Sequence, residues 1–248
     1  MEPLFIKNTN LSEAWTEVLN TLVSNSGKEI SPLLLTLTDF VESSDVRELL
    51  DADLASHDLP SIQTVSETIF PQSLYQFCGW DRHELYDQYM RNYQRIRRID
   101  SSNHKGTYFQ RMIAYQNAGQ PINQLEMIIT SILSTTNKRR SKLQASIFDP
   151  EQDHTNGPYQ RFPCLQHVTF YKSETGGLVL NSFYAIQFFY RRAYGNWLGL
   201  INLGKFIAQE TGLEFERLNC FIGVEQLDNL GKTSAKDLLD RINLSSIL

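Results

Sequence analysis

Apolar residues recur at helical spacing in two stretches of the chain, residues 10–24 and 121–135. Ser12 is the expected N-terminal cap of the first helix, and a proline opens the second, where its missing N–H is not needed. We also expect an exposed helix over 81–98 with Asp81 as its cap, a helix over 196–211 ended by Gly212, and a short polar helix over 233–243 capped by Thr233 or Ser234.

Runs of branched and aromatic residues indicate strands between these helices. The longest covers 178–190, after a turn at Gly176-Gly177, and shorter strands are expected at 30–41, 141–148, 164–172 and 213–223. Residues 43–56 are charged and should form a loop with a short helix, whereas Pro71 should break any helix within 61–77. Helices and strands thus follow one another without a recognisable linker, which predicts an α+β fold in a single domain, 1–248.

The composition is that of an ordinary globular protein, with 41% hydrophobic and 21% charged residues. It excludes disordered, collagen-like and coiled-coil chains. A net charge of −5 argues against a broad basic surface for duplex nucleic acid. Three scattered cysteines do not make a disulfide framework or a structural zinc site. Without an apolar run of membrane-spanning length or a signal-peptide pattern, we expect a soluble cytoplasmic protein.

The sequence holds no glycine-rich phosphate motif, no HExxH and no GxSxG. A bound phosphate would therefore need arginines. Arg139 and Arg140 have the forked geometry that phosphate oxygens favour, although most such charge runs are simply solvated. The helical run from Arg91 to Arg98 fits a solvated face better than a contact with nucleic acid.

Cys164 follows a proline at the start of an expected strand. A free thiol in such a place is more often a small buried side chain than a nucleophile. His167 lies three residues on, and an offset of three in an alternating strand points to the opposite face, so a local Cys–His pair is not expected. Glu67 stands among apolar residues and is either a helix-surface group or a buried carboxyl able to act as acid or base.

Several of these segments together resemble the thymidylate synthases and the related pyrimidine nucleotide hydroxymethylases. The run N-W-L-G-L-I-N-L-G-K-F-I-A-Q-E-T-G-L-E-F from Asn196 is similar, without gaps, to the asparagine-led helix of the family. Pro163-Cys164 followed by Phe170-Tyr171 resembles the family's nucleophile strand.

Three weaker matches complete a resemblance that covers about residues 61–228. Ile122-Asn123-Gln124-Leu125 followed by Arg139-Arg140 resembles a helix and an arginine pair, and Gly106-Thr-Tyr-Phe, which contains Tyr108, resembles a Gly-Pro-x-Tyr segment. Residues 65–70 resemble the segment that carries the family's catalytic glutamate, here Glu67.

The resemblance implies a thymidylate synthase-like fold, with flanking helices on a large mixed sheet that pairs back-to-back in a homodimer. It implies a transferase acting at C5 of a pyrimidine nucleotide, by hydroxymethyl or methyl transfer, through a covalent bond from Cys164 to C6. Methylenetetrahydrofolate would be the one-carbon donor. By the same resemblance Glu67 would relay protons and Asn196 would read the base, and the other substrate-binding residues would be Tyr108, Arg192 and, from the partner subunit, the Arg139-Arg140 pair.

The sequence departs from the family pattern in three places. Leu165 follows the cysteine where the family has histidine, and Ala185-Ile186-Gln187-Phe188 replaces Arg-Ser-x-Asp, which removes two phosphate ligands and the aspartate that holds folate. Gln226 and Asp228 replace the His-x-Tyr that grips the ribose, while Arg191 and Arg192 are candidates for the lost arginine. Two alternatives stay open: a nucleotide-binding or interaction module with the same fold and no turnover, and a structural protein with accidental matches.

Overall fold

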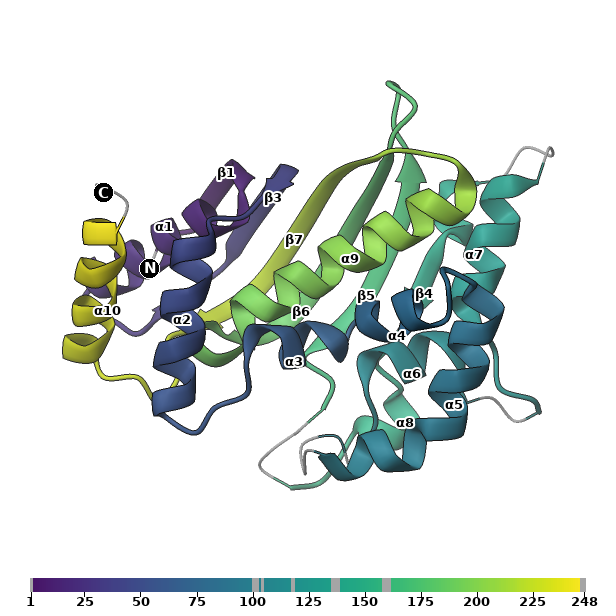
Figure 1. Ribbon diagram of the computed structural model, residues 1–248, viewed down its shortest axis with the longest axis horizontal. Helices are drawn as coiled ribbons and strands as arrows, with labels where there is room; N and C mark the ends of the chain where they lie inside the picture. The colour runs from purple at the N-terminus through teal and green to yellow at the C-terminus, as the bar shows by residue number, and fades with distance from the viewer. Residues whose placement is uncertain are drawn as a thin grey trace.

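A mixed β-sheet forms the centre of the computed structural model, which describes residues 2–99, 103, 105–116, 119–134, 139–157 and 162–245 (Figure 1). Its seven strands include a path in the order β1-β3-β7-β6-β5-β4, with β2 beside β7. They are β1 (Leu4–Asn10), β2 (Glu29–Ile30), β3 (Leu33–Val41), β4 (Gln144–Ser146), β5 (Leu165–Lys172), β6 (Leu178–Phe188) and β7 (Phe215–Gln226). The β1–β3 and β6–β7 pairs are parallel and the other pairs antiparallel. The expected α+β class with a large mixed sheet is confirmed.

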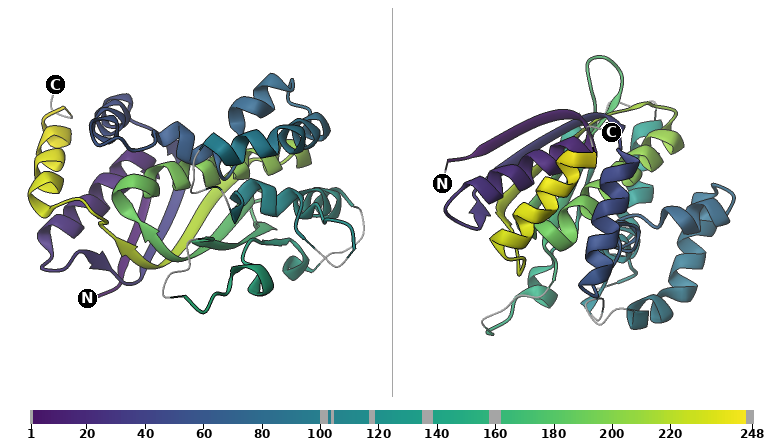
Figure 2. Two further views of the ribbon diagram at one scale, coloured as in Figure 1. Left: turned by 90° about the horizontal axis from the view of Figure 1, so that it is seen from below. Right: turned by 60° about the vertical axis from the view of Figure 1, so that its left-hand side comes forward.

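The longest helices pack around this sheet. They are α1 (Leu11–Ser24), α2 (Ser44–Ser56), α5 (Arg82–Ile99), α7 (Gln124–Leu133), α9 (Tyr194–Thr211) and α10 (Lys232–Ser245); the shorter ones are α3 (Ile62–Glu67), α4 (Gln72–Phe77), α6 (Tyr108–Ile113) and α8 (Pro150–Asp153). α9 runs along the sheet and packs on β6 and β7, and α2, α3 and α5 lie on the same side of the sheet (Figure 2). Among the residues just described, none of the helices combines the length and apolar character that a membrane span requires.

Most of the expected elements are present, with ends that differ by a few residues. Asp81 caps α5 by accepting from the N–H groups of His83 and Glu84, and Gly212 ends α9 in the left-handed conformation. Pro71 separates α3 from α4, as expected. The expected strand at 178–190 ends at Phe188 because the chain then enters a π-helical turn, Phe189–Ala193, that leads into α9.

Three expectations about the first half of the chain are wrong or incomplete, and one strand there was not expected. Asn10, not Ser12, caps α1, because its side chain accepts from the N–H groups of Ser12 and Glu13. Ser12 instead lies inside the helix, where its hydroxyl accepts from the N–H of Ser43 at 2.9 Å. Most of the segment 43–56 is the helix α2, capped by Ser43, since Val46, Leu50 and Leu54 fall four residues apart and are buried. The expected strand at 30–41 is two strands, and β1 was not expected because its apolar part is so short.

The regular alternation of side chains breaks near the cavity in each of the three central strands, β5, β6 and β7. Tyr184 and Gln187 of β6 are both buried although they lie three residues apart, and so are Ile222 and Glu225 of β7. The β5–β6 register also shifts after Leu165, which pairs with Tyr184. A strict alternation would turn Gln187 and Glu225 toward the opposite face. The break therefore brings two polar side chains to the helix-covered side.

Candidate active site

A cavity of about 210 Å³ lies where the start of β5, the end of β6 and the first turn of α9 meet. Cys164, Asn196, Tyr108 and Arg192, four of the seven predicted site residues, line it. Four larger hollows, of about 360 to 730 Å³, lie elsewhere, and two of them are lined by Arg140 and Arg217 or by Lys142, but the described walls of all four hold no cysteine. The 210 Å³ cavity is therefore the place where a nucleophile, an amide and cations come together.

Cys164 stands directly before β5, where its carbonyl oxygen accepts from the N–H of Ala185 at 3.2 Å. This bond fixes the residue against β6. Burial raises the pKa of the Cys164 thiol above its ordinary value, and the charges of Arg192 and then Arg191 oppose that rise. The thiol is thus protonated at neutral pH, and the arginines are the groups that favour its thiolate.

Tyr108 begins α6 beside the same thiol. Thr107 caps this helix by accepting from the N–H of Gln110 at 3.2 Å, and the ring of Tyr108 stacks on Phe162 at 5.3 Å between centroids. Burial raises the pKa of Tyr108, the charge of Cys164 adds to the rise, and the backbone N–H groups of Leu165 and Cys164 oppose it. The tyrosine therefore remains a neutral hydroxyl that lies against the start of β5.

Asn196 lies in the first turn of α9 and is only 4% exposed. Its carboxamide has no hydrogen-bond partner among the residues that the structure describes. An amide that lines a cavity can receive a polar ligand there, since it offers both a donor and an acceptor. Gly195 allows this placement, because a Cβ there would lie 2.6 Å from Cβ of Val65 on α3.

The π-helical turn aims two arginines at the cavity. Arg191 pairs with Asp228 at 2.7 Å, and its guanidinium lies over the ring of Phe188 at 4.4 Å. Arg192 also lines the cavity. Tyr190, which precedes the two arginines in the same turn, connects the turn to α2: its hydroxyl donates to Asp53 at 2.6 Å.

The structure does not bring Glu67 or the arginine pair to this cavity. Glu67 ends α3 next to Thr68, a lining residue, but its carboxylate accepts from the Gln63 side chain at 2.7 Å and from the Ser73 hydroxyl at 2.8 Å. Arg139 and Arg140 are exposed near β4, and the guanidinium of Arg140 lies 5.4 Å from the ring centre of Tyr171.

Two further polar residues belong to the surroundings of the cavity: Gln187, which the sequence offers only as a substitute for the lost folate acceptor, and Glu225, which was not anticipated. Gln187 lines the cavity, and Glu225 is its register partner on β7. The sequence carries no signal for the inward direction of either, since both stand at positions that strict alternation assigns to the other face. His167 pairs with Phe183 on that other face and does not line the cavity, in agreement with the expected separation from Cys164. Within the described ranges no three His, Cys, Asp or Glu side chains are grouped to bind a metal ion.

No protein-family model matches the sequence, and none of the curated proteins matches it. A functional assignment for this chain therefore rests on the residues and geometry of the cavity.

Proposed function

We propose that this chain has the thymidylate synthase fold and acts at C5 of a pyrimidine nucleotide through a covalent bond from the Cys164 sulfur to ring C6. The supporting observation is the convergence of Cys164, Asn196, Tyr108 and Arg192 in one cavity from separate segments of the chain. The resemblance, which comes from the sequence alone, gives Cys164 the role of the nucleophilic thiol, Asn196 that of the base reader, and Tyr108 and Arg192 those of substrate contacts. A chain with accidental matches has no reason to gather them.

Each group has a task in this chemistry. Arg192, with Arg191 beside it, attracts the phosphate and stabilises the Cys164 thiolate. The thiolate adds to C6, and the electrons of the C5–C6 double bond move to O4, which makes C5 nucleophilic. The Asn196 amide accepts from N3–H and donates to O4 of a uracil ring, or the reverse arrangement binds cytosine. C5 then takes up a proton or a one-carbon group, the hydrogen originally on C5 leaves as a proton, and the sulfur leaves from C6 as the double bond re-forms.

Methylenetetrahydrofolate does not fit the residues around the cavity. The position that would need a carboxylate for the pterin is Phe188, whose ring is covered by the guanidinium of Arg191 at 4.4 Å. We therefore derive no step through folate, and exchange of the C5 proton, which needs no donor, is the diagnostic reaction.

A nucleotide-binding module without turnover is the second candidate. It is favoured by the state of Glu67, whose carboxylate already accepts from Gln63 and Ser73 and does not line the cavity. Such a module would bind the nucleotide through Asn196 and Arg192 without forming a bond to sulfur. Reversible binding without a mass change would identify it.

A homodimer is the proposed assembly. On the sheet face opposite α9, the rings of Phe183 and Phe221 stack at 5.3 Å between centroids and remain 39% and 38% exposed. Arg140 belongs to the same face, because it lies over Tyr171, whose neighbour Phe170 is fully buried on the other side. Arg140 thus lies on the face of the sheet opposite its own cavity. It is placed to contact a second copy of the chain that packs on this face.

The test is release of tritium from uridine and deoxyuridine monophosphates labelled at C5. Wild-type protein should release tritium to water, and Cys164→Ser, a change of one atom, should not, since serine is a far weaker nucleophile at neutral pH. Cys78→Ser is the matched control because Cys78 lies between α4 and α5, outside the cavity. Equal release by Cys164→Ser and wild type would refute the covalent mechanism.

A further inference from the structure

Gln187 is the most deeply buried polar side chain among the residues that line the cavity. It is 1% exposed, against 4% for Asn196. Its amide nitrogen, Nε2, has no hydrogen-bond partner in the described part of the chain. Buried polar atoms are almost always satisfied, so this nitrogen needs an acceptor that the described residues do not supply. Because Gln187 lines the cavity, a polar atom of a bound ligand is in a position to be that acceptor.

The orientation of the Gln187 amide is fixed by Trp197, the residue after Asn196 on α9. Nε1 of Trp197 donates to Oε1 of Gln187 at 3.2 Å. An indole N–H only donates, and Trp197 is fully buried, so a reversed amide would set two donors against each other and leave both unsatisfied. The free end of Gln187 is therefore the NH₂ group, which offers a donor and no acceptor.

Glu225 does not bind this NH₂ group, although it is the register partner of Gln187 on β7. Both carboxyl oxygens of Glu225 are themselves without a hydrogen-bond partner among the described residues. The fixed donor also excludes one role for Gln187: a free NH₂ end cannot replace the carboxylate acceptor that is missing at Phe188. The donor remains available to the cavity.

We propose that Gln187 is a second base-reading residue of this cavity, whose NH₂ group donates to a carbonyl oxygen of the pyrimidine ring. The assignment rests on the function proposed above. The Asn196 amide can turn to suit a donor or an acceptor, whereas the Gln187 amide is held by Trp197. Gln187 therefore determines selectivity: it favours a ring with a C=O group at this position and disfavours one with an amino group there.

Uracil offers two such oxygens, O2 and O4. The N–H of Ala185, which binds the carbonyl of Cys164, lies two residues before Gln187 on β6, or about 6.5 Å along the strand. A ring whose C6 faces the thiol can span this spacing with one of its carbonyl groups. Contact with O4 would select uracil over cytosine, which has an amino group on C4. Contact with O2 would accept both bases.

The experiment measures reversible binding of uridine monophosphate by calorimetry. Cys164→Ala is the parent protein, because it separates binding from bond formation, and Gln187→Met or Trp197→Phe is added to it. Methionine has no N–H to donate. Trp197→Phe is the matched control, because it also removes the hydrogen bond between Trp197 and Gln187 but keeps the NH₂ group. Gln187→Met should weaken binding by about 5- to 150-fold, the effect of leaving a buried acceptor unpaired, and Trp197→Phe should weaken it less.

Analogues of the nucleotide identify the oxygen that Gln187 contacts. Sulfur is a weak acceptor, so either 2-thiouridine or 4-thiouridine monophosphate should bind the parent protein more weakly than uridine monophosphate. This loss should shrink in Gln187→Met. If the contact is to O4, cytidine monophosphate should also bind the parent more weakly, and Trp197→Phe should narrow that difference because the freed amide can reverse.

Two results would overturn the assignment. One is equal affinity of Gln187→Met and Trp197→Phe for uridine monophosphate, with the same losses for the thio analogues. The other needs no variant of Gln187: a parent protein that binds uridine and both thiouridine monophosphates equally well.

The binding measurements also separate this assignment from the covalent mechanism. Wild-type protein that binds uridine monophosphate in a manner dependent on Gln187 but gains no mass would refute the bond to Cys164 and support Gln187 as the base reader of a binding module. A parent protein that binds no pyrimidine nucleotide would refute the proposed function and the role of Gln187 with it.

Discussion

Glu225 and Glu67 show how the surroundings of a carboxyl group decide what it can do. One carboxylate oxygen of Glu67, Oε1, accepts from the side chain of Gln63 and from the N–H and hydroxyl of Ser73. Glu225 has no partner in the described structure and is fully buried. A buried carboxyl is held in its neutral form, and its ionisation is a cost to the folded state.

Replacing Glu225 should therefore change how stability depends on pH. The unfolded chain has an ordinary glutamate pKa near ~4.3, whereas burial raises the pKa of Glu225 in the folded protein. Between these two values the folded state binds more protons, so the stabilising contribution is complete below the unfolded pKa and is lost as pH rises toward the folded pKa. Glutamine cannot ionise. The free energy of unfolding of Glu225→Gln should therefore rise relative to that of wild type by up to about 1.4 kcal/mol for each pH unit above the unfolded pKa.

Urea unfolding at several pH values between 5 and 9 measures this difference. Glu29→Gln controls for the loss of one acidic residue at an exposed position. If wild type and Glu225→Gln lose stability in parallel as pH rises, the carboxyl of Glu225 is not held protonated by the fold.

The residue types of the candidate site could be read from the sequence only in part. The segments around Cys164, Asn196 and Tyr108 carry recognisable neighbours, and the structure gathers them in one cavity. The burial of Gln187 and Glu225 on the helix-covered side could not be predicted, because their inward direction depends on a break in alternation that leaves no mark in the local sequence.

At the scale of elements, the packing of α9 on α3 sets the position of Asn196. A Cβ at Gly199 would lie 2.7 Å from the carbonyl oxygen of Ser66, which is backbone and cannot turn away. The two helices can approach this closely only because Gly195 and Gly199 present no side chain to α3.

Gly199→Ala should consequently destabilise the protein. Alanine favours a helix interior over glycine by about 0.5–1 kcal/mol, but overpacking against a fixed backbone atom costs about 1–3 kcal/mol, so the clash wins. Gly231→Ala is the control, since its nearest neighbour would be 4.0 Å away. Urea midpoints for both variants give the comparison, and a Gly199→Ala protein as stable as the control would show that the helices are not in close contact.

Elements with strong local signals were predicted well. The apolar spacing of α1 and α7 and the caps of α5 and α9 are confirmed. β1 was not predicted and α2 was predicted only as a short helix, because both contain few apolar and many polar residues. Tertiary contacts, such as the pairing of Ile6 with Leu35, determine the structure of these segments. The mixed pairing of the sheet is likewise a property of long-range contacts that periodicity does not encode.

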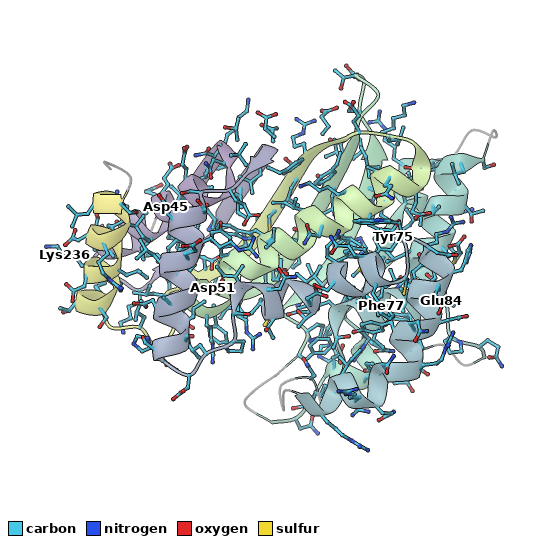
Figure 3. All side chains as sticks on the ribbon, viewed as in Figure 1. Asp45, Asp51, Tyr75, Phe77, Glu84 and Lys236 are labelled. Atoms are coloured by element: carbon cyan, nitrogen blue, oxygen red, sulfur yellow. The ribbon has the colours of Figure 1, made fainter. Side chains whose placement is uncertain are left out.

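At the scale of the whole molecule, the exposed aromatic pair on the sheet predicts self-association. Phe183→Asp should convert a dimer into monomers, because it places a charge in an apolar contact that a second copy would bury. Phe77→Asp is the matched control: Phe77 is 82% exposed but lies on α4 (Figure 3). Sedimentation velocity on wild type and both variants distinguishes these states.

The same assembly predicts complementation between inactive subunits. A mixture of Cys164→Ala and Arg140→Ala chains should regain C5 exchange, since one cavity in each mixed dimer would combine an intact thiol with an intact arginine from its partner. A wild-type protein that sediments as a monomer at assay concentration would exclude this arrangement.

The central claim is that Cys164 forms a covalent bond to a pyrimidine nucleotide, and intact-mass measurement after rapid denaturation tests it most directly. Wild-type protein incubated with uridine or deoxyuridine monophosphate should gain the mass of one nucleotide, and Cys164→Ala should gain none while still binding the nucleotide reversibly. An unmodified wild-type mass in the presence of bound nucleotide would contradict the claim, and so would an adduct that persists in Cys164→Ala.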